Sequence, residues 1–478
     1  MRIFKSIVAI ALVISLCFTT PQISVFATQI ASSKSSQAQS QEFIYPVNKD
    51  AKIDNEYKKE PLLKLPDVSN DNQNDENHGT PIAINEYSKI YKTGDNAYQT
   101  VYTTVPNTYK DSFGKQQEID TTLVKKNEFF GEEYFTSNAN SLAVKLPLSI
   151  DKGDGVTYSK DGVSIKMIPL EGDYTKIAVK DNAVLYNNVF DGIDVQYTSL
   201  ETSIKEDIIL NKYVNKNEFK YQLQADNVDV RLENGVINIY KWNNNTPVMS
   251  LTAPLMTDSV GNMNENVKLS LEKKLGNNYI TVTADKDWLS SSERVYPVKI
   301  DPNVTIPASN VTVITTSEYR GTYAGKSYGY VGSLSGDEIG VPGADLGKTR
   351  MYMKVNADLS SIPSEARIDN ATLQVYQYTR PGGNNGEIFT SYYLQDNWNP
   401  ATINWANSLG LSKEPSGDGC TSGSNIGFHS FDAKTAVNNW FSGSSSNYGF
   451  VITAANEILT GAAFFTPLSN LQIISHIP

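Results

Sequence analysis

Apolar and polar residues alternate in short runs from about residue 82 to about residue 306. Typical runs are residues 98–105, 163–168 and 235–240. Each run spans roughly five to eight residues and ends at Gly, Asn, Asp or Pro, a spacing typical of short antiparallel strands. No stretch of this region has apolar residues at convincing helical spacing. The pattern therefore predicts an all-β region, built as a sandwich or as stacked antiparallel sheets.

A second region, residues 303–478, shows the same alternation. Residues 349–355 and 371–378 alternate strictly enough to predict half-buried strands. A stretch rich in Tyr and Gly, residues 319–332, and a Gly/Asn loop at 381–386 interrupt the strands. We therefore expect an all-β chain with two β-sandwich-like domains, the second beginning at residue 303.

One short helix is expected inside the second domain, between residues 428 and 454. Asp432 is placed at its N-cap, because the carboxylate can accept from the free N–H groups of the first turn. Gly443 and a run of serines then end the helix. Four apolar residues recur at helical spacing and predict one buried face: Ala436, Val437, Trp440 and Phe441. The helix is interpreted as a strap across the sandwich, with Trp440 as a plug over the core.

The first 80 residues have a different character. Residues 1–27 have the parts of a secretory signal peptide: Arg2 and Lys5, an uncharged apolar stretch, and small residues at 25 and 27. Residues 28–80 are rich in Ser, Gln, Asn, Lys and Asp and are expected to be a disordered linker. No later run reaches the roughly 20 apolar residues of a membrane-spanning helix. We therefore expect a secreted, extracellular protein without a membrane span.

Charge and cysteine content narrow the class of partner. Removal of Arg2 and Lys5 leaves 39 of the 41 basic residues against 52 acidic ones, so the formal net charge changes from −11 to −13. An acidic surface argues against nucleic acid and anionic lipid as the main partner. After the signal peptide, Cys420 is the only cysteine, so an internal disulfide is excluded and the core must hold the fold.

Two blocks of the first domain carry a resemblance. Residues 189–197 with 204–210, and residues 287–289 leading to 294–302, resemble the N-terminal region of bacterial wall-associated and Rhs-type surface proteins. In that family these segments precede long repeat regions and sometimes a C-terminal toxin. The resemblance implies a wall-associated or Rhs-like N-terminal domain at residues 81–302, and it places the protein at the cell wall.

The second domain is similar to the DNRLRE domain of large surface proteins. The similar segments include Arg350, the turn at 358–363, residues 368–373 and the stretch from Trp398 to Trp405. The resemblance implies a jelly-roll-like sandwich related to carbohydrate-binding modules, with a structural signature formed by Arg350, Trp405, Asp432 and Trp440. Residues 471–478 match poorly the aromatic last strand expected after Pro467. The domain is therefore interpreted as a shortened, truncated member without that strand.

A search for catalytic residues finds no motif of the phosphate-binding, serine-hydrolase or zinc-protease kind. His429 is interpreted as the solvent-facing residue of a strand anchored by Phe428 and Phe431. Glycoside hydrolysis requires two acids on either side of a cleft. The available acids are Asp345, Glu387, Asp396 and Asp432, and one sequence does not show that any two of them converge in space. We expect no enzyme activity and no cofactor. A structural Ca²⁺ ion near Asp345, Asp358 or Asp432 stays open, so no metal site is assigned.

Aromatic residues fit binding better than catalysis. Sugar rings stack on exposed aromatic faces, and several aromatic residues lie in or beside turn-rich segments: Tyr319, Tyr323, Tyr328, Tyr330, Tyr392, Tyr393 and Trp398. The glycan-binding candidates are Tyr328, Tyr330, Tyr393, Trp398 and Asp396. The alternative for each ring is a place in the sandwich core, which is the favoured interpretation for Trp405 and Trp440.

The sequence therefore predicts a secreted, non-catalytic surface protein that binds extracellular or cell-wall polysaccharide through its C-terminal sandwich. Two other classes stay open. One is a structural N-terminal segment of an Rhs or wall-associated protein that presents a toxin. The other is a polysaccharide-degrading enzyme that uses Asp396 or Asp432.

Overall fold

A computed structural model describes residues 80–477 of the chain, with short gaps. The gaps are residues 128–131, 151–152, 173–176, 253, 275, 307–310, 324–328, 340, 342, 380–387, 420, 424–426 and 458–462. The predicted signal peptide, the predicted linker, Tyr328, Glu387 and Cys420 lie outside the described residues.

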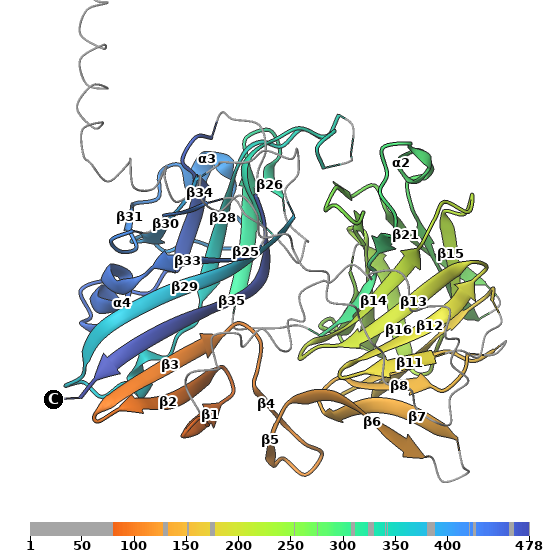
Figure 1. The fold of residues 1–478 in the computed structure, drawn as a ribbon, viewed down its shortest axis with the longest axis horizontal. Coiled ribbons are helices and arrows are strands. Elements are labelled where there is room, and N and C mark those ends of the chain that lie inside the picture. Colours follow the sequence, from red (N-terminus) through yellow and green to blue (C-terminus); the bar gives the residue numbers. More distant parts are fainter. Residues whose placement is uncertain are drawn as a thin grey trace, which may run out of the picture. The chain divides into compact units, whose positions relative to one another are not determined.

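Antiparallel β-sheets make up most of the described chain, which confirms the all-β prediction (Figure 1). Helices are short and few among these residues: α2 (Lys286–Ser290), η3 (Leu359–Ser361), α3 (Trp405–Ser408) and α4 (Lys434–Phe441). None of the described helices is long and apolar enough to cross a membrane.

Two large sheets form the sandwich of the N-terminal region, and buried side chains from both sheets make one core. The first sheet runs, in spatial order, through β21 (Lys268–Lys274), β22 (Asn277–Thr283), β15 (Glu218–Ala225), β10 (Val163–Pro169), β9 (Val156–Lys160), β8 (Ala143–Pro147), β7 (Glu133–Ala139) and β6 (Asp120–Asn127). The second runs through β11 (Ile177–Lys180), β12 (Ala183–Phe190), β13 (Ile193–Ser199), β14 (Ser203–Leu210), β24 (Asn303–Thr305), β18 (Pro247–Leu251), β17 (Val236–Lys241) and β16 (Val228–Glu233), with β19 (Met256–Thr257), β20 (Met263–Asn264) and β23 (Val298–Ile300) attached.

A carboxylate lies inside this core. Glu206 on β14 is 1% exposed, and its Oε1 accepts hydrogen bonds from Tyr221 at 2.6 Å and Tyr197 at 3.2 Å. Its Oε2 and the nearby buried hydroxyl of Tyr158 have no hydrogen-bond partner among the described residues. Burial raises the pKa of Glu206 to about 7, although the two tyrosine hydroxyls lower it. The protonated acid is therefore the form that suits this core.

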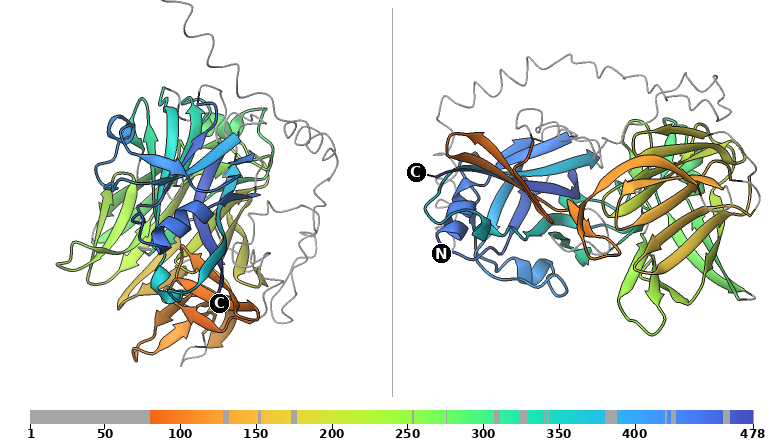
Figure 2. Two further views of the ribbon diagram at one scale, coloured as in Figure 1. Left: turned by 90° about the vertical axis from the view of Figure 1, so that its left-hand side faces the viewer. Right: turned by 90° about the horizontal axis from the view of Figure 1, so that it is seen from below.

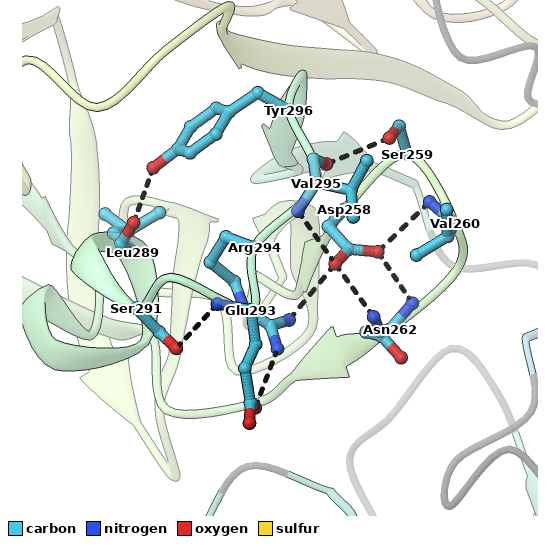
Figure 3. A network of polar contacts seen from close by, with 10 residues as sticks. All are labelled: Asp258, Ser259, Val260, Asn262, Leu289, Ser291, Glu293, Arg294, Val295 and Tyr296. Atoms are coloured by element: carbon cyan, nitrogen blue, oxygen red, sulfur yellow. Dashed lines mark hydrogen bonds and ion pairs between the residues drawn. The ribbon is translucent and has the colours of Figure 1, made fainter.

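The segment that carries the wall-associated resemblance is held by a buried ion pair (Figure 3). Arg294 stacks its guanidinium on the Trp288 ring, 4.2 Å from the centroid, and Nη1 lies 3.2 Å from Oδ2 of Asp258. The Asp258 side chain is fully buried and also accepts from the backbone N–H groups of Val260 and Asn262. The pair therefore ties the segment after α2 to the turn between β19 and β20, so the resemblance residues have a structural role here.

The C-terminal region is a second sandwich. One sheet contains β33 (Gly427–Asp432), β29 (Arg367–Thr379) and β35 (Ala463–His476). The facing sheet contains β26 (Gly321–Tyr323), β25 (Val311–Ser317), β28 (Gly347–Val355), β34 (Phe450–Ala454) and β30 (Ile388–Leu394), with β31 (Lys413–Pro415) and β32 (Thr421–Gly423) beside β30. Strand β27 (Gly329–Leu334) pairs with both β28 and β35 and links the two sheets.

The strand expected to be missing is present. Residues 471–476 belong to β35, and Leu471 and Ile473 are fully buried in the core between the sheets. The interpretation of a sandwich without its last strand is therefore wrong. Burial alternates along residues 471–476 as in a strand, with Leu471, Ile473 and Ser475 buried; the lack of aromatic residues had suggested otherwise.

Three strands from the other end of the described chain join this same sheet. β1 (Ala83–Asn85), β2 (Ser88–Gly94) and β3 (Ala97–Thr103) form a meander, and β3 pairs with β35 from Ala97↔His476 to Thr103↔Asn470. Figure 1 and Figure 2 show these orange strands beside the dark blue β35. The sequence had assigned residues 83–103 to the N-terminal domain, whereas their hydrogen bonds belong to the C-terminal sheet. A hairpin of β4 (Thr108–Lys110) and β5 (Gln116–Glu118) follows them.

The predicted helix exists as α4, but its start differs from the prediction. Ala433 occupies the N-cap without a side-chain hydrogen bond, and Asp432 instead accepts from the backbone N–H of Lys434 at 2.9 Å. Three of the four residues predicted for the apolar face, Ala436, Val437 and Trp440, are buried, and Phe441 is partly buried against the same core. The Trp440 ring makes edge contacts with Tyr393 and Phe450, which confirms its place over the core.

The strand before α4 has the opposite facing from the one expected. His429 is 3% exposed and contacts the Phe389 ring edge-on, whereas Phe428 is 39% exposed. Phe431 is fully buried, and strand alternation places His429 on the same side as Phe431. The prediction of a solvent-facing His429 is therefore wrong, because Phe428 was taken as a core anchor.

The buried Glu206 makes the stability of the N-terminal sandwich depend on pH. Because its folded-state pKa of about 7 exceeds its ordinary value of 4.5, the unfolded chain releases this proton first. The free energy of unfolding should therefore fall by up to about 3 kcal/mol as pH rises from about 4.5 to 7, and level off above that. Asp194, whose pKa burial raises to about 6, adds to the same trend.

Urea unfolding at a series of pH values measures this slope. Glu206→Gln should flatten it between pH 5 and 7, while the exposed Glu272→Gln on β21 should leave it unchanged. Equal slopes in the parent and the Glu206→Gln protein would contradict the assignment.

Candidate functional site

The outer face of the sheet formed by β28, β34 and β30 carries the candidate site. Strand alternation sends Met351, Ile452 and Phe389 into the core and turns their neighbours outward. On the outer side Tyr352, Val451 and Tyr392 lie directly opposite one another across the three strands. Part of this face is covered by the segment that contains α3, which packs Ile403 and Leu411 against it.

Arg350 on β28 organises the polar part of this face. Its Nε and Nη2 donate to Oε1 and Oε2 of Glu457 at 2.6 and 2.9 Å, a bidentate pair. The guanidinium also lies over the Trp405 ring, 4.9 Å from the centroid. Both charged side chains are mostly shielded, at 16% and 20% exposure, and the hydrogen bond to Glu457 raises the pKa of Arg350. The pair fixes one geometry at the base of the site.

A second cation and aromatic ring lie close to this pair. Lys413 on β31 places Nζ 4.8 Å from the centroid of the Tyr392 ring. Burial, followed by the charge of Arg350, lowers the pKa of Lys413. We call Arg350, Tyr392, Trp405, Lys413 and Glu457 the Arg350 cluster. All five are partly exposed or on the exposed side of the sheet.

Local hydrogen bonds fix the backbone on both sides of Trp405. Asn404 caps α3 in a reciprocal box: its side chain accepts from Asn407 N–H, and the Asn407 side chain accepts from Asn404 N–H. Thr322 on β26 donates a hydrogen bond to the carbonyl of Ile403 just before the cap. These bonds hold the tryptophan ring over the sheet before any ligand arrives.

The Arg350 cluster has the composition of a polar ligand site. Two partly exposed rings offer apolar stacking surfaces, the cations offer N–H donors, and the Glu457 carboxylate offers acceptor lone pairs. Sugars present just this mixture of apolar C–H faces and hydroxyl groups. The Arg350 cluster therefore has the groups needed to bind a sugar, and among its five residues there is no nucleophile paired with a base.

Three of the predicted glycan-binding residues have little exposed surface. Tyr330 is fully buried, and its hydroxyl donates to Glu265 at 2.5 Å. Tyr393 is 3% exposed and its hydroxyl accepts from Asn439 at 2.8 Å. Trp398 is 5% exposed, donates from Nε1 to the carbonyl of Tyr448 at 2.9 Å and contacts Tyr352 edge-on. None of the three presents an open ring face for stacking, because each packs into the interior of the fold.

The remaining candidates lie elsewhere. Asp396 is exposed, and its Oδ2 accepts from the backbone N–H of Ser412 at 2.7 Å, a bond that lowers its pKa. Asp396 therefore fastens the two ends of the loop that carries α3. Tyr328 lies outside the described residues.

The signature residues divide between core and surface. Trp440 lies in the core, and Asp432 packs closely on Gly417, where an added Cβ would lie 2.3 Å from Oδ1. Arg350 and Trp405 instead meet on the outer face, so the preference for a core position of Trp405 is not what the structure shows. Among the described residues no group of three His, Cys, Asp or Glu side chains is placed to hold a metal ion.

Sequence reasoning missed Lys413 and Glu457. Tyr392 was in the wider aromatic set, and strand alternation already separates it from its buried neighbour Tyr393. The Arg350–Glu457 pair spans 107 residues along the chain, and no local pattern marks Glu457 as its partner.

Comparisons with known proteins support a carbohydrate-related C-terminal domain. Residues 311–466 match the model of carbohydrate-binding module family 96. All five residues of the Arg350 cluster lie within that range. The finer assignment to DNRLRE domains stays a prediction.

The relatives are named as nucleases or as wall-associated. The chain is 28% identical over 394 residues to the tRNA nuclease WapA of Bacillus subtilis (strain 168), covering 76% of this chain and 16% of that protein. The tRNA(Glu)-specific nuclease WapA of Bacillus subtilis subsp. natto is 27% identical over 389 residues with the same coverage. A wall-associated protein of Geobacillus stearothermophilus is 25% identical over 195 residues, covering 36% of this chain and 72% of that protein.

These relatives bear on two expectations. The likeness to wall-associated proteins supports the expected cell-surface location. The exclusion of nucleic acid as a partner has no support, because relatives are named as tRNA nucleases. The chain spans only 16% of the length of those nucleases. The chain thus contains a region similar to a carbohydrate-binding module, and part of it is similar to a wall-associated protein.

Proposed function

We propose that this is an exported, non-catalytic surface protein that binds polysaccharide through the Arg350 cluster. The observation that carries the proposal is the coincidence of two findings. The cluster is a preorganised set of partly exposed rings and polar groups, and it lies inside the range matched by a carbohydrate-binding module family. The predicted signal peptide and the wall-associated relative support a location where such glycans occur.

A polysaccharide-degrading activity is the weaker alternative. Asp396 and Asp432 each hold a local backbone N–H, of Ser412 and Lys434, and neither belongs to the Arg350 cluster. Incubation with soluble polysaccharides followed by a reducing-sugar assay tests this point. Release that disappears in Asp396→Ala or Asp432→Ala would replace our proposal with catalysis.

A role as the N-terminal part of a toxin-presenting protein is a second candidate, favoured by the short share of the nuclease relatives that this chain spans. Immunoblotting of the native protein from its own cells, with an antibody against residues 119–306, measures its size. A band far above the 52.7 kDa of this chain would favour that role. Polysaccharide binding by the present residues is compatible with it and is tested separately below.

Removal of either ring should weaken glycan binding while the fold is kept. Trp405→Ala and Tyr392→Ala each remove a stacking surface, and we expect about tenfold lower affinity for each, about 1.4 kcal/mol. Affinity electrophoresis of the mature chain against β-glucan, mannan, chitin oligosaccharides and polygalacturonate measures this. Trp242→Ala is the matched control, because Trp242 is 69% exposed in the N-terminal region. Unchanged binding in both cluster variants would contradict the site.

The Arg350–Glu457 ion pair should stabilise the folded protein as a unit. Arg350→Met leaves a shielded carboxylate unpaired, and we expect a loss of about 1 to 2 kcal/mol in the free energy of unfolding. Glu457→Gln in the same background should restore part of that loss, so a double-mutant cycle should give a coupling energy of about 1 kcal/mol. Additive effects in the cycle would show that the pair does not act as a unit.

A further inference from the structure

The two edges of β35 are used differently. Along one edge β29 pairs with it over nearly its whole length, from Arg367↔His476 to Thr379↔Phe464. The other edge is shared. β27 pairs with residues 463–465, and β3 pairs with residues 470–476. Strand β3 therefore pairs with the part of this edge that β27 leaves unpaired.

Side chains anchor β3 as well as its backbone. Tyr102 is 2% exposed within the core of the C-terminal sandwich, and its hydroxyl donates to the carbonyl of Asp358 at 2.8 Å and lies 3.1 Å from Ser361 Oγ. Burial raises its pKa to about 12.

Glutamine side chains connect three strands of the sheet in a row. Gln99 on β3 donates to Gln472 on β35 at 3.1 Å, and Gln472 donates to Gln374 on β29 at 3.0 Å. Gln99 and Gln374 are 3% and 7% exposed. Shielded amide N–H donors of this kind require acceptors, and the two bonds are made only in this register of β3 on β35; Gln99 Oε1 has no partner among the described residues.

The two strand segments that pair here, residues 97–103 of β3 and residues 470–476 of β35, both lie outside residues 311–466, the range matched by the carbohydrate-binding family. We infer that residues 83–103 are a complementing segment of the C-terminal sandwich, which is assembled from two distant parts of the chain. The unit comprises residues 83–103 and 311–477, and the N-terminal sandwich is an insertion between them. Residues 471–476, a poor match to the expected last strand, are the strand that receives this segment.

Physical chemistry explains why the segment is needed. Without β3, a seven-residue stretch of β35 would present an open row of N–H and C=O groups, a known route to aggregation. Removal of the Tyr102 ring together with β3 would also leave a cavity in a close-packed core. The long intervening chain is a small obstacle, because the entropy cost of loop closure grows only with the logarithm of length.

Cleavage of the full mature chain tests the inference directly. A protease site is placed in the turn at residues 111–115, where Phe113 is 95% exposed, and a second between residues 306 and 311. After both cuts, the fragment ending near residue 113 should remain bound to the C-terminal fragment, which is captured by a tag at its end. Loss of the first fragment from a C-terminal fragment that stays folded by circular dichroism would overturn the inference.

Hydrogen exchange gives a second, independent measurement on the uncut chain. Tyr102→Phe keeps the ring and removes both hydroxyl contacts, and Tyr102→Ala removes the ring as well. We expect amide exchange of residues 471–476 to accelerate by about tenfold or more in Tyr102→Ala and by less in Tyr102→Phe. Tyr319→Ala, at a 67% exposed ring, is the control.

Unchanged protection of residues 471–476 in both Tyr102 variants would overturn the inference. Neither readout uses a glycan, so the result is separate from that of the binding proposal. The inference can hold for a protein that binds no polysaccharide, and it can fail for one that does.

Discussion

The C-terminal sandwich depends on one strand whose backbone must be paired on both edges. β35 runs through the middle of its sheet, between β29 on one side and β27 and β3 on the other. Because an unpaired buried N–H or C=O costs as much as a lost hydrogen bond, every element that pairs with β35 is fixed by it. The core beneath the facing sheet, and therefore the orientation of the Arg350 cluster on its outer side, rests on that pairing.

The local pattern of apolar and polar residues was enough to predict strands and one helix, but it did not predict which strands pair with each other. Period-two alternation identified the all-β class, and helical spacing identified α4 with its buried Trp440. The same alternation was read with the wrong phase at His429, because Phe428 was assumed to be inside when the neighbouring histidine is. The pairing of residues 97–103 with 470–476 could not be predicted, since nothing in either stretch identifies a partner more than 360 residues away.

The candidate site shows the same limit. Arg350 and Trp405 were selected from a resemblance, and the guanidinium does stack on the ring. The contact lies on the outer face of the sheet, and the positions of the two residues in the sequence gave no sign of it. Tyr330, Tyr393 and Trp398 were selected because they lie beside turns, yet each hydroxyl or indole N–H has an interior hydrogen-bond partner. Tyrosine and tryptophan satisfy both core and surface environments, so residue type alone does not decide between them.

The distance in sequence between β3 and β35 also sets an order of events in time. Gln99 and Gln472 are 373 positions apart, so the first strands of the sandwich leave the ribosome long before β35 has been synthesised. Until residues 470–476 arrive, β1–β3 can form only a small meander, which is marginal on its own in water. Folds governed by such distant contacts form slowly. The N-terminal sandwich, whose strands are all available earlier, is therefore expected to fold before the C-terminal sandwich is complete.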